Sequence, residues 1–156
     1  MLEGPEHRVA PLPEEVDDAL AVQTYLAPAF LPQATACEFV HRGRLEPNVE
    51  RVVALLKERR DAMLEAFEQE LPEGTTWSRP QGGYFTWVDF AEGVDSAALL
   101  DTATERGVTF VKGSDFYPQA GGESSARLAF SFVSPAEIRT GVALLAEVLS
   151  AAPVAV

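Results

Sequence analysis

The chain has 156 residues, enough for one domain with a hydrophobic core, and its 47% hydrophobic and 23% charged residues are ordinary for a globular protein. Its net charge of −12 argues against nucleic acid and anionic membranes as partners, since phosphate binding needs clustered Lys and Arg. The single cysteine, Cys37, cannot form an internal disulfide, which fits a cytoplasmic location, and its helical context predicts a small buried side chain.

Prolines and glycines mark the N-terminal elements. Residues 1–13 carry three prolines and no apolar period, which predicts an extended arm. Helices are predicted over about 13–25 and 32–42, the second ended by Gly43. The clearest helix follows over about 47–71, where apolar residues recur at steps of three and four.

The period then changes to that of strands. Aromatic and β-branched residues predict strands over 76–77 and 84–90, joined by a turn through Gly82 and its neighbours. Asp95 can cap a short helix, and Gly107 is placed to end it.

The C-terminal third again contains strands followed by a helix. Short buried strands are predicted over 108–111 and 127–133. The sequence Ser-Pro-Ala-Glu over 134–137 has the form of a capping box, with proline at the first helical position, and opens a helix to about Leu149.

This order of elements predicts the fold. It gives an α+β layer in which a small three- to four-stranded sheet is covered by helices. The predicted domain spans residues 14–150, between the arm of residues 1–13 and a frayed tail over 151–156.

Arg127 is the residue for which the sequence most strongly suggests a binding role. It lies between the acidic, glycine-rich loop 121–125 and an apolar strand, and a cation leading into a buried strand is costly unless something pairs with it. A guanidinium matches a carboxylate through two parallel hydrogen bonds and stays charged at any working pH. From the residues alone, the partner is either a nearby Glu or Asp or the carboxylate of a ligand.

Three segments carry a family resemblance: 80–88 (PQGGYFTWV), 107–117 (GVTFVKGSDFY) and 126–132 (ARLAFSF). In this order and spacing they resemble the C-terminal part of class I/II aminotransferases, the fold-type I enzymes that use pyridoxal 5′-phosphate (PLP). The resemblance implies the small domain of such an enzyme, a sheet with helices on one side. The family's large domain has no counterpart in these residues.

The resemblance also implies site residues. In the family, the arginine of this motif grips the α-carboxylate of the substrate, so Arg127 is expected to bind an amino-acid or 2-oxo-acid carboxylate, weakly in this chain alone. Gly83 and Tyr84 resemble the strand that borders the active-site mouth and are the other substrate-binding candidates. Tyr84 and Phe85 are candidate pocket walls, although simple core packing is the favoured alternative. Lys112 replaces a proline common in the family and is expected to be an exposed lysine at a strand end.

The lysine inventory bears on the cofactor. PLP-dependent transamination needs a lysine that forms a Schiff base, and the sequence has only Lys57 and Lys112. Neither lies in the family's Ser-x-x-Lys or Ser-x-Ser-Lys context, and the other groups that hold PLP belong to the large domain. We therefore expect PLP in the complete family enzyme, none bound to this chain alone, and no catalytic residue or metal ligand within it.

These observations lead to one principal hypothesis and two alternatives. The first is the substrate-facing segment of an amino-acid aminotransferase, inactive alone and dependent on a large-domain partner chain, with 2-aminoadipate-like, aromatic or branched substrates implied by the resemblance. The alternatives are a non-catalytic module that binds an amino acid or a protein, and a folded gene remnant. Apolar residues within 14–42, among them Tyr25, Leu26, Phe30 and Leu31, predict self-association, most simply as a homodimer.

Overall fold

The computed structural model describes residues 29–151. The chain divides into two compact units, Met1–Asn48 and Val49–Val156. The predicted arm, the first predicted helix and the tail beyond residue 151 lie outside the described residues, so the domain limits proposed from the sequence stay predictions. No helix within residues 29–151 has the length and apolar character needed to cross a membrane.

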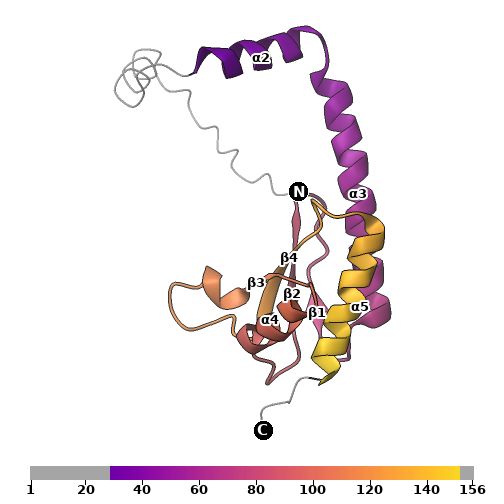
Figure 1. Cartoon of the computed structure of the whole chain (residues 1–156), viewed down its shortest axis with the longest axis vertical. Helices are drawn as coiled ribbons and strands as arrows, with labels where there is room; N and C mark the ends of the chain where they lie inside the picture. The colour runs from indigo at the N-terminus through magenta and orange to yellow at the C-terminus, as the bar shows by residue number, and fades with distance from the viewer. Residues whose placement is uncertain (1–28, 152–156) are drawn as a thin grey trace, which may run out of the picture. The chain divides into compact units, whose positions relative to one another are not determined.

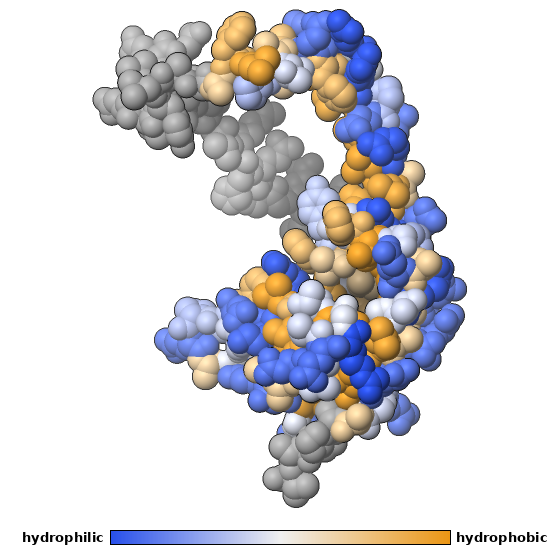
Figure 2. All heavy atoms as spheres, in the orientation of Figure 1, coloured by the Kyte–Doolittle hydropathy of each residue, from blue (hydrophilic) through white to orange (hydrophobic). Residues whose placement is uncertain are grey.

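The first unit contains helix α2, Phe30–His41, which agrees with the second predicted helix. Gly43 follows it with a φ of 63°, a left-handed conformation that suits a helix end. None of the residues of α2 is buried, and Phe30 and Leu31 are 82% and 75% exposed. Figure 2 shows apolar side chains at the surface of this helix. The prediction that Cys37 is buried is wrong: it is exposed, because α2 places no side chain in a core.

Helix α3, Leu45–Glu70, is the long helix that the apolar period predicted, and it begins slightly before Pro47. Its buried residues all lie in its C-terminal half: Ala62, Met63, Ala66 and Phe67. The aromatic ring of Phe67 is fully buried and packs on Trp77, with ring centroids 5.5 Å apart. This half of α3 therefore anchors the helix to the sheet.

The second unit contains one sheet of four antiparallel strands in the order β1-β2-β4-β3 (Figure 1). The strands are β1 Thr76–Trp77, β2 Phe85–Asp89, β3 Val111–Lys112 and β4 Ser125–Ala129. The predicted α+β fold with a small sheet is confirmed.

Two predicted strands have different limits in the structure. The strand predicted over 108–111 is β3, and it begins only at Val111 because the pairing with β4 covers only Val111 and Lys112. The strand predicted over 127–133 is β4, which ends at Ala129, although Phe130 still donates a backbone hydrogen bond to the Tyr84 carbonyl. Residues 131–133 leave the sheet, and Arg59 of α3 donates from Nη1 to the carbonyl of Ser131.

The remaining helices begin where the sequence indicated. In α4, Ser96–Glu105, the Asp95 carboxylate accepts a hydrogen bond from the Ala97 backbone at 2.8 Å. In α5, Pro135–Ala151, the Ser134 and Glu137 side chains form the predicted capping box with each other's backbone. A short 3₁₀ helix, η1 (Gly113–Phe116), follows β3.

One hydrophobic core joins these elements. Alternate residues of β2 and β4 (Thr86, Val88, Ala126 and Leu128) form the covered face of the sheet and are buried. Helices α3, α4 and α5 supply most of the other core residues, including Phe67, Leu99, Ala103, Ile138, Val142 and Leu145. The opposite face therefore carries the side chains that remain available for function.

Candidate functional site

The open face of the sheet is formed by Phe85, Trp87 and Asp89 of β2 with Arg127 and Ala129 of β4. Because side chains alternate along a strand, these residues point away from the covered face. The register pairs Trp87 with Arg127 and Phe85 with Ala129. Arg127 therefore has one aromatic residue directly across the ladder and another on the diagonal, within reach of a long side chain.

Arg127 is flanked by two aromatic rings. Its Cζ lies 4.1 Å from the centroid of the Phe85 ring and 4.6 Å from that of the Phe116 ring, which η1 supplies. Both distances are within the range of a cation–π interaction, which orients a guanidinium against the electron-rich face of a ring. Within residues 29–151, Nε of Arg127 is buried and has no hydrogen-bond partner.

No carboxylate among the described residues forms an ion pair with Arg127. Glu123, in the acidic loop before β4, instead accepts a hydrogen bond from the Gly121 backbone at 2.8 Å through Oε1. Asp89, on the same open face, accepts hydrogen bonds from Trp87 Nε1 at 2.9 Å and Ser125 Oγ at 2.6 Å. The guanidinium is thus half-buried, surrounded by rings, and without a counter-ion from this part of the chain.

Tyr84 adjoins this cluster. Its ring is 53% exposed and meets Phe85 edge-on, with centroids 6.3 Å apart. The favoured expectation that Tyr84 and Phe85 pack in the core is wrong, because Phe85 is also 41% exposed and lies on the open face. The other interpretation, in which both are walls of a binding site, stays a prediction.

Gly83 lies in the turn before β2, with a φ of 79° that favours glycine. It lines a pocket of about 370 Å³ between that turn and α3. The pocket is lined by Val53, Leu56, Lys57, Arg60, Gln81, Gly82, Gly83 and Phe130, and Arg127 is not part of this lining.

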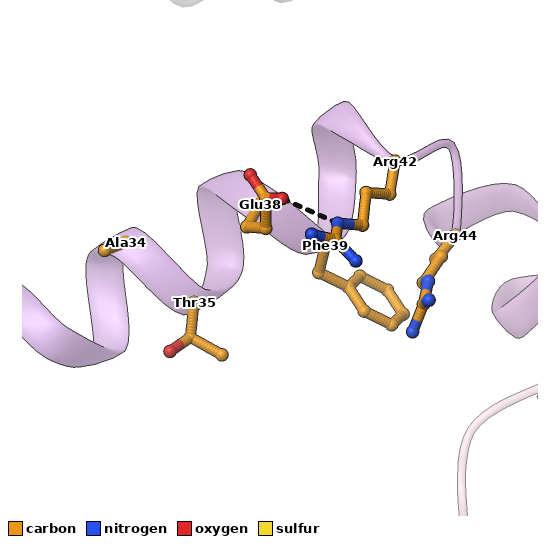
Figure 3. Close-up of a pocket in the computed structure, with 6 residues that line it drawn as sticks. All are labelled: Ala34, Thr35, Glu38, Phe39, Arg42 and Arg44. Atoms are coloured by element: carbon orange, nitrogen blue, oxygen red, sulfur yellow. Dashed lines mark hydrogen bonds and ion pairs between the residues drawn. The ribbon is translucent and has the colours of Figure 1, made fainter.

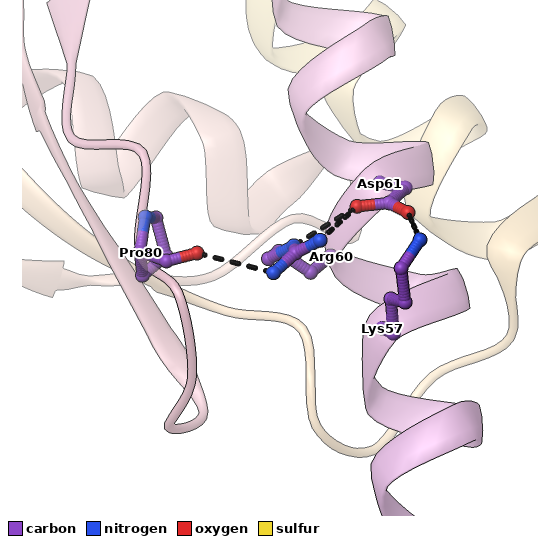
Figure 4. Close-up of polar contacts among 4 residues, drawn as sticks. All are labelled: Lys57, Arg60, Asp61 and Pro80. Carbon is purple, nitrogen blue, oxygen red and sulfur yellow. Dashed lines mark hydrogen bonds and ion pairs between the residues drawn. The ribbon is translucent and has the colours of Figure 1, made fainter.

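The two cations of this pocket are paired with Asp61. Figure 4 shows Arg60 donating to the Pro80 carbonyl and to Asp61, which also accepts from Lys57. These contacts from Lys57 and Arg60 hold the pKa of the Asp61 carboxyl below its usual value. Both cations therefore already have a carboxylate partner.

Phe116 is the site residue that the sequence did not reveal. It lies in a polar loop, four residues beyond β3, and nothing in its spacing connects it to Arg127. The sequence signal was its place in the family-like segment 107–117, and the structure leaves it 44% exposed. Lys112, expected to be an exposed residue at a strand end, is at the end of β3 but is half-buried and ion-paired with Asp115 at 3.4 Å.

Two further hollows contain fewer groups that could bind a charged ligand. In the first unit, a shallow one of about 420 Å³ is lined by α2 and the turn after it. Arg42 in its lining forms an ion pair with Glu38 at 2.6 Å, drawn as a dashed line in Figure 3. In the second unit, an apolar one of about 440 Å³ lies beside the start of α5, with Phe132 and Gly141 in its lining. No group of three or more His, Cys, Asp or Glu side chains within residues 29–151 could hold a metal ion.

The described residues do not fit PLP by themselves. Lys57 forms an ion pair with Asp61 at 2.7 Å and Lys112 forms one with Asp115 at 3.4 Å, and neither stands in the sequence context of the family's Schiff-base lysine. Lys57 lies on α3, and Lys112 lies on β3 directly after Val111, which pairs with Arg127 in the sheet. What this part of the chain provides is a cation framed by aromatic rings, the type of group that binds a carboxylate.

A small antiparallel sheet with helices on one face is consistent with the small domain of a fold-type I aminotransferase. The sequence model of the family described as aspartate amino-transferase matches residues 16–155, and the chain belongs to this family. The chain spans about 30% of the length of the curated relatives it matches.

Individual relatives agree with this assignment. The chain is 36% identical over 117 residues to aromatic-amino-acid aminotransferase 1 of Thermococcus litoralis, a match that covers 75% of this chain and 28% of the relative. It is 30% identical, with a TM-score of 0.80, to the crystal structure of the α-aminoadipate aminotransferase LysN from Thermus thermophilus, complexed with N-(5′-phosphopyridoxyl)-L-leucine, covering 89% of this chain and 36% of that one. It is also 30% identical to the uncharacterized HTH-type transcriptional regulator YdfD of Bacillus subtilis, over 89% of this chain and 27% of the regulator.

Proposed function

We propose that residues 49–151 form the substrate-facing segment of a PLP-dependent amino-acid aminotransferase, in which Arg127 binds the α-carboxylate of the amino acid and of the 2-oxo acid. The observation that carries this proposal is a half-buried guanidinium that contacts Phe85 and Phe116 but has no carboxylate partner within the described residues. A buried cation needs a counter-charge, and a substrate carboxylate would supply one.

The arrangement suits a carboxylate for a geometric reason. Aromatic rings interact with the face of a guanidinium, whereas its N–H groups donate in the plane of the group, so contact with a ring leaves the in-plane donors available. A bidentate, charge-assisted contact contributes about 1.5–3 kcal/mol. One such contact corresponds to a dissociation constant of about a millimolar or weaker. The remaining affinity of a complete enzyme would come from its other groups.

PLP would be supplied with the large domain of the family fold. Its chemistry in the complete enzymes starts from a Schiff base with a lysine. Lys57 and Lys112 are both ion-paired, and neither stands in the sequence context of the family's Schiff-base lysine, so we propose that the 156-residue polypeptide does not transaminate alone. Gly83 and Tyr84 stay candidates for the rim of the substrate pocket, with no cofactor contact assigned to them.

Helix α2 is proposed as a surface that a partner covers, either the large domain on another polypeptide or a second copy of this chain. The exposed rings and aliphatic groups of Phe30, Leu31 and Val40 support this, because a large apolar patch usually marks an interface. Light scattering at tens of micromolar, roughly, would test the homodimer, and a clean monomer would leave only the large-domain partner. A cytoplasmic location is proposed with it, on the basis of the single cysteine.

The substrate class follows from the relatives only as a proposal. Their names specify aromatic amino acids and α-aminoadipate, and the LysN complex contains a leucine derivative. L-Leucine is therefore a suitable probe, because its only carboxylate is the one that Arg127 is proposed to bind.

One observation supports a second candidate function. The likeness to YdfD, described as a transcriptional regulator, covers more of this chain than the likeness to the Thermococcus litoralis enzyme. The domain could thus act as a non-catalytic module that binds an amino acid or a protein. A neighbouring reading frame that encodes the cofactor-binding domain would favour the enzyme, whereas one that encodes a DNA-binding domain would favour the module. The absence of both frames, with no amino-acid binding, would leave a folded gene remnant.

Calorimetry with L-leucine tests the role of Arg127. We expect weak binding to the wild-type chain, at least about tenfold weaker binding to Arg127→Ala, and none of L-leucinamide, which lacks the carboxylate. Arg139→Ala is the matched control, because Arg139 is an arginine that is already bound to Glu65 across α5 and α3. Equal heats for the wild type and Arg127→Ala would remove Arg127 from the site.

A further inference from the structure

Phe116 contacts Arg127 without being needed for the core. It is 44% exposed, yet its ring lies 4.6 Å from Arg127 Cζ and 5.6 Å from the Trp87 ring, which it meets at 75°. Phe116 is not part of the core formed with α3, α4 and α5, and its ring contacts are with Trp87 and Arg127.

The loop that presents Phe116 has a closely packed backbone. A Cβ added to Gly113 would lie 2.5 Å from the Gly122 carbonyl oxygen and 2.7 Å from Ser125 Cβ. A Cβ on Gly122 would lie 2.7 Å from both the Gly113 carbonyl carbon and the Tyr117 ring. Real Cβ atoms essentially never approach so closely, so the two ends of the 113–122 loop meet at glycines and place η1 at a fixed height above the sheet.

Trp87 supports the ring from the sheet. Its indole N–H donates to Asp89 at 2.9 Å, and the same carboxylate oxygen accepts from Ser125 Oγ at 2.6 Å. The indole is thereby fixed in its plane, and Phe116 packs edge-on against it. Phe116 is thus confined between a fixed indole and the guanidinium.

We propose that Phe116 is a positioning residue for carboxylate binding: with Phe85, it fixes the plane of the Arg127 guanidinium so that its N–H edge is presented to the ligand. Because Nε is buried without a hydrogen-bond partner in this part of the chain, the rings set the orientation of the group and hydrogen bonds do not. This inference rests on the proposed role of Arg127. It goes beyond that role, because it assigns a function to a loop residue that itself donates nothing to the ligand.

The test is an NMR titration of the full chain with L-leucine, using four variants. Phe116→Leu removes the ring and keeps an apolar side chain, and Phe116→Tyr restores the ring. Phe132→Leu is the matched control, because Phe132 is 89% exposed and lies in the lining of the apolar pocket beside α5. Arg127→Ala identifies the Nε–H resonance of Arg127 by its disappearance.

We expect Phe116→Leu to weaken leucine binding at least about threefold, the lower range of a lost cation–π contact. The Arg127 Nε–H resonance should also shift, because the ring current of Phe116 is gone. Phe116→Tyr and Phe132→Leu should keep both the affinity and the resonance of the wild type. If Phe116→Leu does not fold, Phe116→Met provides the same comparison.

The outcomes separate the two proposals. Wild-type affinity in Phe116→Leu, with binding lost in Arg127→Ala, overturns the positioning role and leaves the site intact. Weaker binding in Phe116→Leu with an unmoved Arg127 resonance also overturns it, since the loss would then be structural. Wild-type affinity in Arg127→Ala overturns the proposed function, and the positioning role with it.

Discussion

The two faces of the sheet in Val49–Val156 are held by different physical means. On the covered face, Val88, Ala126 and Leu128 are buried against α3, α4 and α5, and their stability comes from apolar area removed from water. On the open face, Arg127 is held by ring contacts with Phe85 and Phe116, and the loop above it by close backbone packing.

This difference separates stability from function. A substitution on the covered face should change the free energy of unfolding and affect binding only through folding. A substitution on the open face should change carboxylate binding with a smaller effect on unfolding, because fewer buried atoms lose their contacts. The following predictions test that separation, from the largest expected effect to the smallest.

Phe67→Ala should give the largest loss of stability. Phe67 is fully buried and packs on Trp77, so its removal should lower the free energy of unfolding by about 3–5 kcal/mol, as for other large core truncations. Denaturant unfolding followed by circular dichroism measures this. Phe132→Ala, at an exposed position, should change the stability by no more than about 0.5 kcal/mol. Similar losses for the two variants would contradict the assignment of the core.

Gly113→Ala tests the loop over the open face. The added methyl group would overlap the Gly122 carbonyl and Ser125, so the loop must shift, at a cost of about 1–3 kcal/mol. The same substitution at Gly141 in α5 meets nothing within 4 Å and should stabilise the helix by about 0.5–1 kcal/mol. Thermal unfolding of both variants gives the comparison. An unchanged transition for Gly113→Ala would mean that the loop is not closely packed.

Glu137 provides a smaller, pH-dependent effect at the start of α5. Hydrogen bonds from the Ser134 hydroxyl and then from its backbone N–H hold the pKa of this carboxyl below its usual value. A carboxyl with a lowered folded-state pKa contributes stability above its unfolded pKa and loses it as the pH falls through the folded value. We therefore expect a loss of stability in acid that is reduced in Glu137→Gln.

An NMR titration of the Glu137 side chain measures that pKa directly. Ser134→Ala should raise it, because the largest cause of the shift is removed, and Arg127→Ala should leave it unchanged. A Glu137 pKa that does not respond to Ser134→Ala would rule out the Ser134 hydroxyl as its main cause.

The smallest expected effect is the amount of PLP adduct formed at the two lysines. Neither Lys57 nor Lys112 stands in the sequence context of the family's Schiff-base lysine, so borohydride treatment of the chain with PLP should trap no more adduct at either position than a surface lysine gives. Mass spectrometry of the peptides that contain each lysine is the measurement. A stoichiometric adduct at one of them would mean that this polypeptide holds the cofactor without a large domain.

Local signals in the sequence predicted the helices well. Asp95 caps α4, Ser134 and Glu137 cap α5, and Gly43 ends α2, because each of these effects depends only on neighbouring residues. The strand limits were less accurate: β3 begins at Val111 and β4 ends at Ala129. A strand ends where its partner ends, and that partner is distant in the sequence.

The candidate site also has features that the sequence could indicate and features that needed the structure. Arg127 could be selected as a candidate from the sequence, because a cation beside an apolar strand has few inexpensive environments and because its motif resembles that of a known family. The exposure of Tyr84 and Phe85 could not, since an aromatic strand residue fits either face until the register is known.

The sequence by itself thus determined the family, the α+β fold and most helix ends, and it made Arg127 the candidate binding residue. Only the tertiary structure decided that Arg127 has aromatic neighbours instead of a carboxylate, and that one of them, Phe116, comes from a loop after β3. The physical reason is that caps and apolar periods act between residues close in the chain, whereas a ring over a guanidinium depends on strand register and on a glycine-to-glycine loop closure that joins distant segments.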